Sequence, residues 1–220
     1  MTVRAALFDL DGTLVDSLED LTDAVNHMLA GFGRPSLTPA SVRRLVGKGA
    51  HNLVRRALET ESEEAITRGI ESFVAYNKDH VTDKSTLYPG VREALGQLAE
   101  NGIRLAVISN KHEALCHLIM EALGIDRLFE IICGGDTFPE LKPSPLPLLQ
   151  TLARLGIAAH DAVMVGDSIN DIQAGQQAGV ATIGCTWGYG GPEELAGADH
   201  CAASPGDLAA ILLSGTLAGF

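Results

Sequence analysis

Short runs of consecutive apolar residues recur along the chain, and polar residues or glycine follow each of them. The runs occupy residues 5–8, 105–108, 129–133, 162–165 and 181–184. Continuous rather than alternating hydrophobicity is typical of strands that are buried on both faces, as in a parallel sheet. Segments with the apolar spacing of helices separate the later runs, at 91–100, 112–123, 146–155 and 172–178. This alternation predicts an open, doubly wound α/β domain.

The stretch from residue 16 to residue 84 departs from this alternation. It has the apolar periodicity of helices at 18–29, 42–46, 52–58 and 65–77, and no convincing strand. We interpret it as a helical subdomain inserted between the first strand and the first helix of the α/β domain. A Tyr-Pro-Gly turn at 88–90 then marks the return to that domain, which comprises residues 1–15 and 85–220.

Composition and charge narrow the classes of function. A chain of 220 residues, 46% hydrophobic and 20% charged, can form one sizeable core and a small accessory domain. The net charge of −12 argues against nucleic acid or an anionic membrane as a partner. No apolar run approaches the ~20 residues that span a bilayer, and no signal peptide is visible. The scattered cysteines favour reduced thiols and a cytoplasmic location: Cys116, Cys133, Cys185 and Cys201.

Polar side chains of the kinds that bind metals and phosphate follow the predicted strands. Asp9 and Asp11 come after the first strand, Ser109 after the second, and Asp167 after the fourth. Ligands of open parallel sheets bind beyond the carboxyl ends of the strands. One aspartate there is weak evidence because aspartate often caps the next helix. Several such residues in register indicate a functional site.

The first acidic pair, Asp9 and Asp11, is two residues apart, so both carboxylates can point into the same space. Gly12 permits a tight turn directly after them. Close carboxylates repel each other unless a cation or a shared proton lies between them. Mg²⁺ bound by few carboxylates together with a substrate phosphate is the usual solution. The alternative is that both aspartates only cap a turn.

The second acidic pair, Asp167 and Asp171, is four residues apart, so both would flank one point at the start of a helix. Asp167 is the stronger candidate for a direct metal ligand, with Asp171 in a supporting role. The alternative is a helix cap and a surface residue. Lys142 would offset the repulsion between an aspartate and a phosphoryl group. Ser109 and Asn110 are suited to holding phosphate oxygens next to the start of a helix.

In combination, these residues resemble the four motifs of the haloacid dehalogenase superfamily: residues 9–13 (Asp-Leu-Asp-Gly-Thr), Ser109, Lys142 and residues 166–171. The likeness covers essentially the whole chain. It implies a Rossmann-like core with an inserted α-helical cap, here residues 16–84, and Mg²⁺ as the cofactor. It also implies that Asp9 is the nucleophile, that Asp11 is the acid/base, and that the backbone carbonyl of Asp11 is a metal ligand.

Within the superfamily, several segments are similar to the phosphoglycolate phosphatase subgroup: residues 46–50, 88–91, 109–111, 134–136, 142–145 and 186–190. This implies hydrolysis of a small anionic phosphate monoester, 2-phosphoglycolate, by a monomer or homodimer. Thr13, Lys48 and Gly49 then join the residues expected to bind phosphate or substrate. The subgroup usually has Asn at the position of Lys48, which in this chain can pair with a substrate carboxylate.

Other functions fit many of the same residues. A phosphosugar mutase of the β-phosphoglucomutase type shares the core residues and the cap position and differs in its product. A phosphonatase would need a Schiff-base lysine from the cap, for which Lys48 is a candidate. A phospho-aspartate receiver domain has similar groups on a doubly wound sheet, but the helical insert and Asp11 argue against it. An inert binding protein would have no reason to keep every catalytic group.

Overall fold

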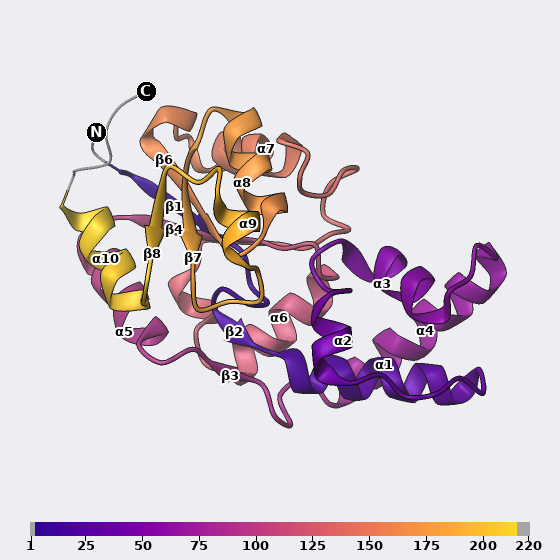
Figure 1. Cartoon of the computed structure of the whole chain (residues 1–220). Helices are drawn as coiled ribbons and strands as arrows, with labels where there is room; N and C mark the ends of the chain where they lie inside the picture. Colours follow the sequence, from indigo (N-terminus) through magenta and orange to yellow (C-terminus); the bar gives the residue numbers. More distant parts are fainter. Residues whose placement is uncertain (1–2, 215–220) are drawn as a thin grey trace.

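A six-stranded parallel sheet forms the centre of the computed structural model, which describes residues 3–214 (Figure 1). The order of the strands is β5–β4–β1–β6–β7–β8, so β1 lies inside the sheet between β4 and β6. Every residue of β1, β6 and β7 is buried, as their continuous apolar runs predicted. The strands are β1 (Ala5–Phe8), β4 (Arg104–Ile108), β5 (Ile131–Cys133), β6 (Ala162–Gly166), β7 (Ala181–Cys185) and β8 (His200–Ala202).

Helices cover both faces of the sheet, which confirms the predicted doubly wound, Rossmann-like α/β fold (Figure 1). One face packs against α5 (Val91–Glu100), α6 (Glu113–Ala122) and α10 (Pro205–Leu213). The other packs against α7 (Leu146–Leu155) and α8 (Ile169–Ala178). Three short helical turns complete this part: η1 (Asp126–Leu128), η2 (Ala159–Asp161) and α9 (Pro192–Leu195). Between residues 3 and 214, no helix has the length and apolar character needed to cross a membrane.

The segment between β1 and α5 forms a helical bundle with a hydrophobic core of its own. Its helices are α1 (Leu18–Gly31), α2 (Pro39–Arg43), α3 (Gly49–Leu58) and α4 (Glu63–Asp79). An antiparallel ribbon of β2 (Val15–Asp16) and β3 (Thr86–Leu87) joins the bundle to the sheet. The Asp20 carboxylate accepts hydrogen bonds from the backbone N–H groups of Lys84 and Ser85, at 3.1 and 2.8 Å. The outgoing and returning connections are therefore held side by side.

Several elements differ from the sequence prediction. α2 occupies residues 39–43 instead of 42–46, because the Thr38 side chain accepts a hydrogen bond from the Ser41 N–H and Pro39 fits the first turn. The β2–β3 ribbon, β8 and α10 were not predicted. β8 is a three-residue edge strand that contains the exposed Cys201, so it lacks an apolar run.

The sheet topology brings three loops together beneath the helical bundle. The chain first builds the sheet on the β4 side of β1 and then crosses to the β6 side. The carboxyl ends of β1, β4 and β6 therefore meet at a topological switch point, where an open α/β sheet leaves a crevice. Asp9, Ser109 and Asp167 directly follow these three strands.

Candidate active site

Three buried carboxylates form a cluster at this switch point. Each of Asp9, Asp167 and Asp171 offers a carboxylate oxygen, and the three oxygens lie within 4.8 Å of one another. Asp9 extends β1, and Asp167 follows β6. Asp171 lies in the first turn of α8, where its side chain and that of Ser168 form a capping box. The sequence prediction that Asp9 and the 167/171 pair lie together thus agrees with the geometry.

Lys142 lies among these carboxylates and is itself almost completely buried. Its Nζ is 2.6 Å from Asp171 Oδ1 and 3.1 Å from Asp9 Oδ1. Asp9 Oδ1 also accepts a hydrogen bond from the Leu10 N–H at 2.7 Å. Asp9 Oδ2 accepts no hydrogen bond from any residue in the range 3–214. One oxygen of Asp9 is therefore fixed by donors, and the other is left for a metal ion or an electrophile.

Two carboxylates of the cluster, those of Asp9 and Asp167, have raised pKa values. Burial raises the pKa of Asp9 to about 6, against the opposing effect of Lys142. Burial, together with the charges of Asp171 and Asp9, raises the pKa of Asp167 to about 7. Burial alone would lower the pKa of Lys142, but Asp171 and Asp9 outweigh it, so that this pKa is raised. At neutral pH the cluster thus holds negative charge that Lys142 neutralises only in part.

This chemistry fits a hard divalent cation such as Mg²⁺. Buried carboxylate oxygens, here within 4.8 Å of one another, are ligands of the kind that it prefers in proteins. Asp9 has a free oxygen, and Asp167 is oriented by donors from neighbouring loops. Asp171 already binds Lys142 and Ser168, which suits a supporting position behind the ligands.

The raised pKa values predict that Mg²⁺ stabilises the protein in a pH-dependent way. Between about pH 4 and 7 the folded protein binds more protons at Asp9 and Asp167 than the unfolded chain, so its metal-free stability falls as pH rises. Mg²⁺ replaces those protons. At a fixed Mg²⁺ concentration of ~100 times the Kd at pH 8, we expect Mg²⁺ to raise Tm by about 5–10 °C at pH 8 and by much less at pH 5, where protons compete for the same carboxylates. Thermal unfolding with Mg²⁺ or with EDTA measures this. Equal shifts at both pH values would contradict the prediction.

Asp167 is held by two loops from distant parts of the chain. The Thr13 hydroxyl donates a hydrogen bond to Asp167 Oδ1 at 3.1 Å, and the Tyr189 N–H donates one to Oδ2 at 2.6 Å. Both loops need glycine beside Asp167. A Cβ on Gly12, which has φ +87°, would lie 2.3 Å from Asp167 Oδ2, and a Cβ on Gly188 would lie 2.3 Å from its Cβ. Thr13 is expected from the sequence to bind phosphate, which stays a prediction; in this structure its hydroxyl contacts Asp167.

Asp11 lies beside the cluster but faces away from it. Its Oδ1 accepts a hydrogen bond from the Ser17 hydroxyl at 2.5 Å, and Lys111 Nζ lies 3.2 Å from both of its carboxylate oxygens. The Asp11 carboxylate therefore pairs with Lys111, and its part in binding a metal stays a prediction. The Lys111 ammonium offsets the charge of Asp11 and leaves this carboxylate directed toward the helical bundle.

The loop after β4 supplies hydrogen-bond donors and a link to the bundle. The Asn110 side-chain amide donates to the carbonyl of Lys142 at 2.8 Å and to that of Gly47 at 2.9 Å, and its Oδ1 accepts from the Lys142 N–H. The Asn110 side chain thus fixes Lys142 and joins it to the helical bundle, and its contact with phosphate stays a prediction. The Ser109 hydroxyl accepts a hydrogen bond from the Lys111 N–H at 3.3 Å. The N–H groups of Asp11 and Asn110 have no acceptor among residues 3–214.

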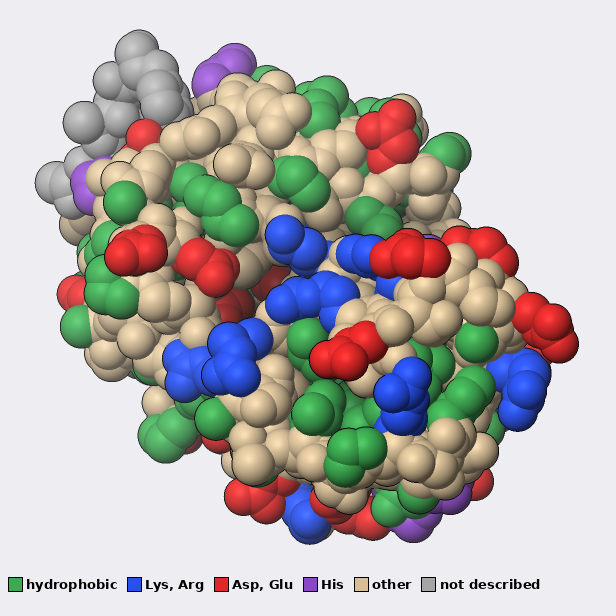
Figure 2. All heavy atoms as spheres, turned by 45° about the vertical axis from the view of Figure 1, so that its right-hand side comes forward, with side chains coloured by type: hydrophobic (Ala, Val, Ile, Leu, Met, Phe, Trp, Pro, Cys, Tyr) green, Lys and Arg blue, Asp and Glu red, His purple; other side chains and the backbone are tan. Residues whose placement is uncertain are grey.

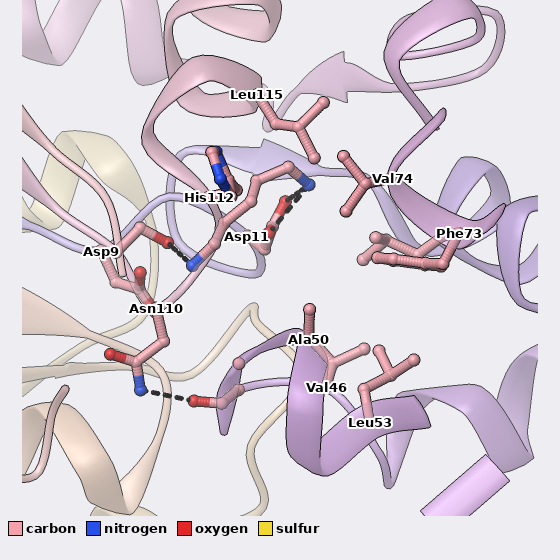
Figure 3. Close-up of a pocket in the computed structure, with 15 residues that line it drawn as sticks. Asp9, Asp11, Val46, Ala50, Leu53, Phe73, Val74, Asn110, His112 and Leu115 are labelled. Atoms are coloured by element: carbon pink, nitrogen blue, oxygen red, sulfur yellow. Dashed lines mark hydrogen bonds and ion pairs between the residues drawn. The ribbon is translucent and has the colours of Figure 1, made fainter. Parts of the chain in front are cut away.

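A cavity of about 580 Å³, counting the part open to solvent, lies between this site and the helical bundle. Asp9, Asp11, Ser109 and Asn110 line it from the sheet side. Figure 3 shows apolar side chains on the opposite side, from the α2–α3 region and from α4: Val46, Ala50, Leu53, Phe73 and Val74. Gly49, the first residue of α3, also lines the cavity. Lys48 does not line it, and its side chain is exposed.

The model of the family described as haloacid dehalogenase-like hydrolase matches residues 6–185. The chain belongs to this family. The match includes the acidic cluster, Lys142 and the whole helical bundle, and it confirms the resemblance predicted from the motifs.

This haloacid dehalogenase-like hydrolase is also similar to individual phosphatases. It is 42% identical over 218 residues to a phosphoglycolate phosphatase of Chromobacterium violaceum, with 97% of this chain and 98% of the relative covered. It is 43% identical over 196 residues to phosphoglycolate phosphatase 1 of Pseudomonas aeruginosa, covering 84% and 70% of the two chains. A crystal structure of a predicted phosphoglycolate phosphatase from Haemophilus somnus has a TM-score of 0.91 and 33% identity, with coverage of 96% and 98%.

The sequence did not identify Arg43 as part of this site. Arg43 in α2 donates from Nε to the carbonyl of Tyr189 at 2.7 Å and from Nη2 to that of Gly188 at 2.9 Å. The same Tyr189 donates its N–H to Asp167, and its hydroxyl accepts a hydrogen bond from the Ser17 N–H at 2.7 Å. Arg43 therefore joins the helical bundle to the loop that contains Tyr189. This loop contacts Asp167 and also Ser17, whose hydroxyl donates to Asp11.

Removing this contact tests whether it matters for turnover. We expect Arg43→Ala to lower kcat/KM for phosphate release by roughly 3- to 10-fold, the value of one or two net hydrogen bonds. Arg44→Ala is a matched control, because the Arg44 side chain bonds to Ala40 and Ser41 of its own segment. Steady-state kinetics of both variants measure the difference. Equal rates for the two variants would show that the contact of Arg43 with the loop has no part in catalysis.

Proposed function

We propose that this haloacid dehalogenase-like hydrolase is a Mg²⁺-dependent phosphatase that hydrolyses 2-phosphoglycolate through a phosphorylated Asp9. The observation that carries the proposal is the environment of the Asp9 carboxylate. Its Oδ1 is held by Lys142 and the Leu10 N–H, its Oδ2 has no hydrogen-bond partner in the described part of the chain, and Asp9 lines the cavity. A carboxylate fixed in this way is oriented for attack on phosphorus.

In the first step, Asp9 Oδ2 attacks the phosphorus atom, and the bond from phosphorus to the ester oxygen breaks. Lys142 and the unpaired N–H groups of Asp11 and Asn110 are the proposed donors to the phosphoryl oxygens, together with the Ser109 hydroxyl. Asp11 enters this step as the carboxylic acid and gives its proton to the departing alkoxide, which leaves as the free alcohol, so that Asp11 remains as the carboxylate beside Lys111. Mg²⁺, held by Asp9, Asp167 and the Asp11 carbonyl, would neutralise the charge that develops on the phosphoryl group.

In the second step, a water molecule attacks the phosphorus atom of the phosphorylated aspartate. Asp11 removes the proton of that water, the acyl phosphate bond breaks, and the Asp9 carboxylate is regenerated with release of inorganic phosphate. One group thus serves as acid and then as base. The Ser17 hydroxyl and Lys111 hold the Asp11 carboxylate beside the cavity, where it can reach both the leaving oxygen and the water.

The helical bundle, residues 16–84, is the proposed cap of this site. Its apolar residues close the cavity opposite Asp9, which would exclude bulk water from the reacting groups. Exposed Arg43, Arg44 and Lys48 belong to α2 and the segment that leads into α3. Figure 2 shows Lys and Arg side chains gathered around a hollow in this face of the molecule. Such a local positive field would attract an anionic ester to a chain with a net charge of −12.

The names of the relatives support 2-phosphoglycolate as the substrate, because the two curated relatives described above are both called phosphoglycolate phosphatases. We further propose that the protein acts in the cytoplasm as a monomer or homodimer, without a nucleic-acid or membrane partner. The net charge of −12 supports the proposed absence of a nucleic-acid or membrane partner.

Phosphate release from a panel of small esters, with Mg²⁺ or with EDTA, tests the proposed function. The panel contains 2-phosphoglycolate, 2-hydroxyethyl phosphate and a hexose phosphate. We expect metal-dependent release with a preference for 2-phosphoglycolate. Release without this preference would overturn 2-phosphoglycolate as the proposed substrate, but the proposed phosphatase activity would stand. An isomerised sugar phosphate as the product would instead indicate a mutase, and a stable phospho-aspartate without turnover would indicate a receiver-like function.

A further inference from the structure

The cavity beside Asp9 is poorly suited to an anion except at one place. Its walls on the bundle side are apolar, and Leu21 and Leu115 extend that surface. A substrate carboxylate that enters such a cavity loses its hydration and needs a cation or several donors in compensation. The position of cations in the cavity therefore decides which leaving groups can bind.

Lys111 is the only Lys or Arg among the described residues that line this cavity. Lys142 lies deeper and already binds two carboxylates. Arg43 lines a second cavity that borders Asp9 and Asp11 on the side of Asp167, where it already donates to the carbonyls of Tyr189 and Gly188. Lys48 is exposed and outside the lining. His112 does line the cavity, but its Nε2 lies 3.1 Å from an oxygen of Asp136 and its side chain is half-exposed. The Lys111 side chain, by contrast, is only 8% exposed and extends to Asp11.

The contact with Asp11 places the Lys111 ammonium where a short substrate needs it. Asp11 is the proposed donor to the ester oxygen of the leaving group, and Lys111 Nζ lies 3.2 Å from both Asp11 oxygens. In 2-phosphoglycolate the carboxylate is separated from the ester oxygen by a single methylene group. A group that binds this carboxylate must therefore lie next to the group that protonates the ester oxygen, as Lys111 does.

We infer that Lys111 determines specificity by binding a carboxylate on the leaving group of the substrate. The inference rests on the proposed function. In the free enzyme the Lys111 ammonium pairs with Asp11, and in the complex it is shared between Asp11 and the substrate carboxylate. Lys48, the cap-loop residue that the sequence suggests for this task, does not take part.

The test compares two substrates that differ only at the proposed contact, 2-phosphoglycolate and 2-hydroxyethyl phosphate. The measured quantity is the ratio of their kcat/KM values. We expect Lys111→Met to lower this ratio by roughly 10- to 100-fold, the value of a hydrogen bond to a charged group. Lys111→Arg, which keeps the positive charge, should retain most of the wild-type ratio. If Lys111 only positions Asp11, both substrates lose activity equally and the ratio is unchanged, which would overturn the inference.

Two further lysine variants complete the experiment. Lys78→Met, at an exposed position of α4, removes the same charge away from the cavity and should leave the ratio unchanged. A fall in the ratio for Lys48→Met but not for Lys111→Met would assign the carboxylate to Lys48 and refute the inference. A wild-type enzyme that does not prefer 2-phosphoglycolate would overturn the proposed substrate, and the inference with it. A preference that survives in Lys111→Met overturns the inference alone.

Discussion

Asp9→Asn is expected to abolish release of phosphate from 2-phosphoglycolate, by on the order of 10⁴-fold or more in kcat, as removal of a nucleophile does in other enzymes. The amide nitrogen and oxygen of asparagine cannot form the acyl phosphate. The fold should remain, because Lys142 keeps its closer partner, Asp171, at 2.6 Å. Phosphate release and thermal unfolding, measured on one preparation whose intact mass excludes deamidation, test both parts.

Asp79→Asn is the matched control for this experiment. Asp79 is an exposed residue at the end of α4, so the same change of charge and shape there should leave kcat unchanged. A further check uses acid-quenched enzyme and radiolabelled substrate. Label should be trapped on the wild-type chain and absent from the Asp9→Asn chain. Turnover by Asp9→Asn near the wild-type rate would remove Asp9 from the role of nucleophile.

The sequence predicted the parts of the site that follow directly from strand order. Asp9, Ser109 and Asp167 each come after a buried apolar run, and parallel strands end at one edge of the sheet. Their proximity therefore needed no knowledge of side-chain packing. Lys142 was harder to place because it lies in a loop, but its charge is of the sign that a buried acidic cluster requires.

Contacts between the helical bundle and the sheet could not be predicted in this way. Arg43 and Tyr189 are separated by most of the chain, and no periodicity in the sequence relates α2 to the loop after β7. The sequence suggested Lys48 for a substrate carboxylate and did not single out Lys111. In the folded chain Lys48 precedes the first turn of α3 and is exposed, whereas the Lys111 side chain extends to Asp11, which is the basis for proposing Lys111.

The Thr13 and Asn110 side chains illustrate a related limit. Both are polar groups at the correct edge of the sheet, and the sequence predicts that both bind phosphate. In the folded chain the Thr13 hydroxyl donates to Asp167, and the Asn110 amide binds the backbone of Lys142. The type of a residue at a strand end thus predicts that the residue lies in the site. Whether a side chain contacts substrate or a neighbouring catalytic group depends on side-chain geometry that residue type does not determine.

Lys142→Met should destabilise the protein as well as inactivate it. The variant leaves Asp9 and Asp171 buried near each other without their cation, and loss of one partner from a buried ion pair costs about 3–5 kcal/mol. The loss should depend on pH. Lys142 lowers the pKa of Asp9, so its removal raises that pKa above about 6. The folded variant then binds more protons than the unfolded chain, and its stability falls as pH rises. Urea unfolding in EDTA should show a larger deficit at pH 8 than at pH 5.

A double variant separates the effect of charge from the effect of packing. Lys142→Met combined with Asp171→Asn removes one of the carboxylates that Lys142 neutralises, so much of the stability lost at pH 8 should return. Activity should not return, because the cation beside the Asp9 nucleophile is still missing. If the double variant is as unstable as Lys142→Met at both pH values, the loss comes from the packing of the lysine stem. Lys142 would then stabilise the fold through its methylene groups, and its charge would serve the phosphoryl group alone.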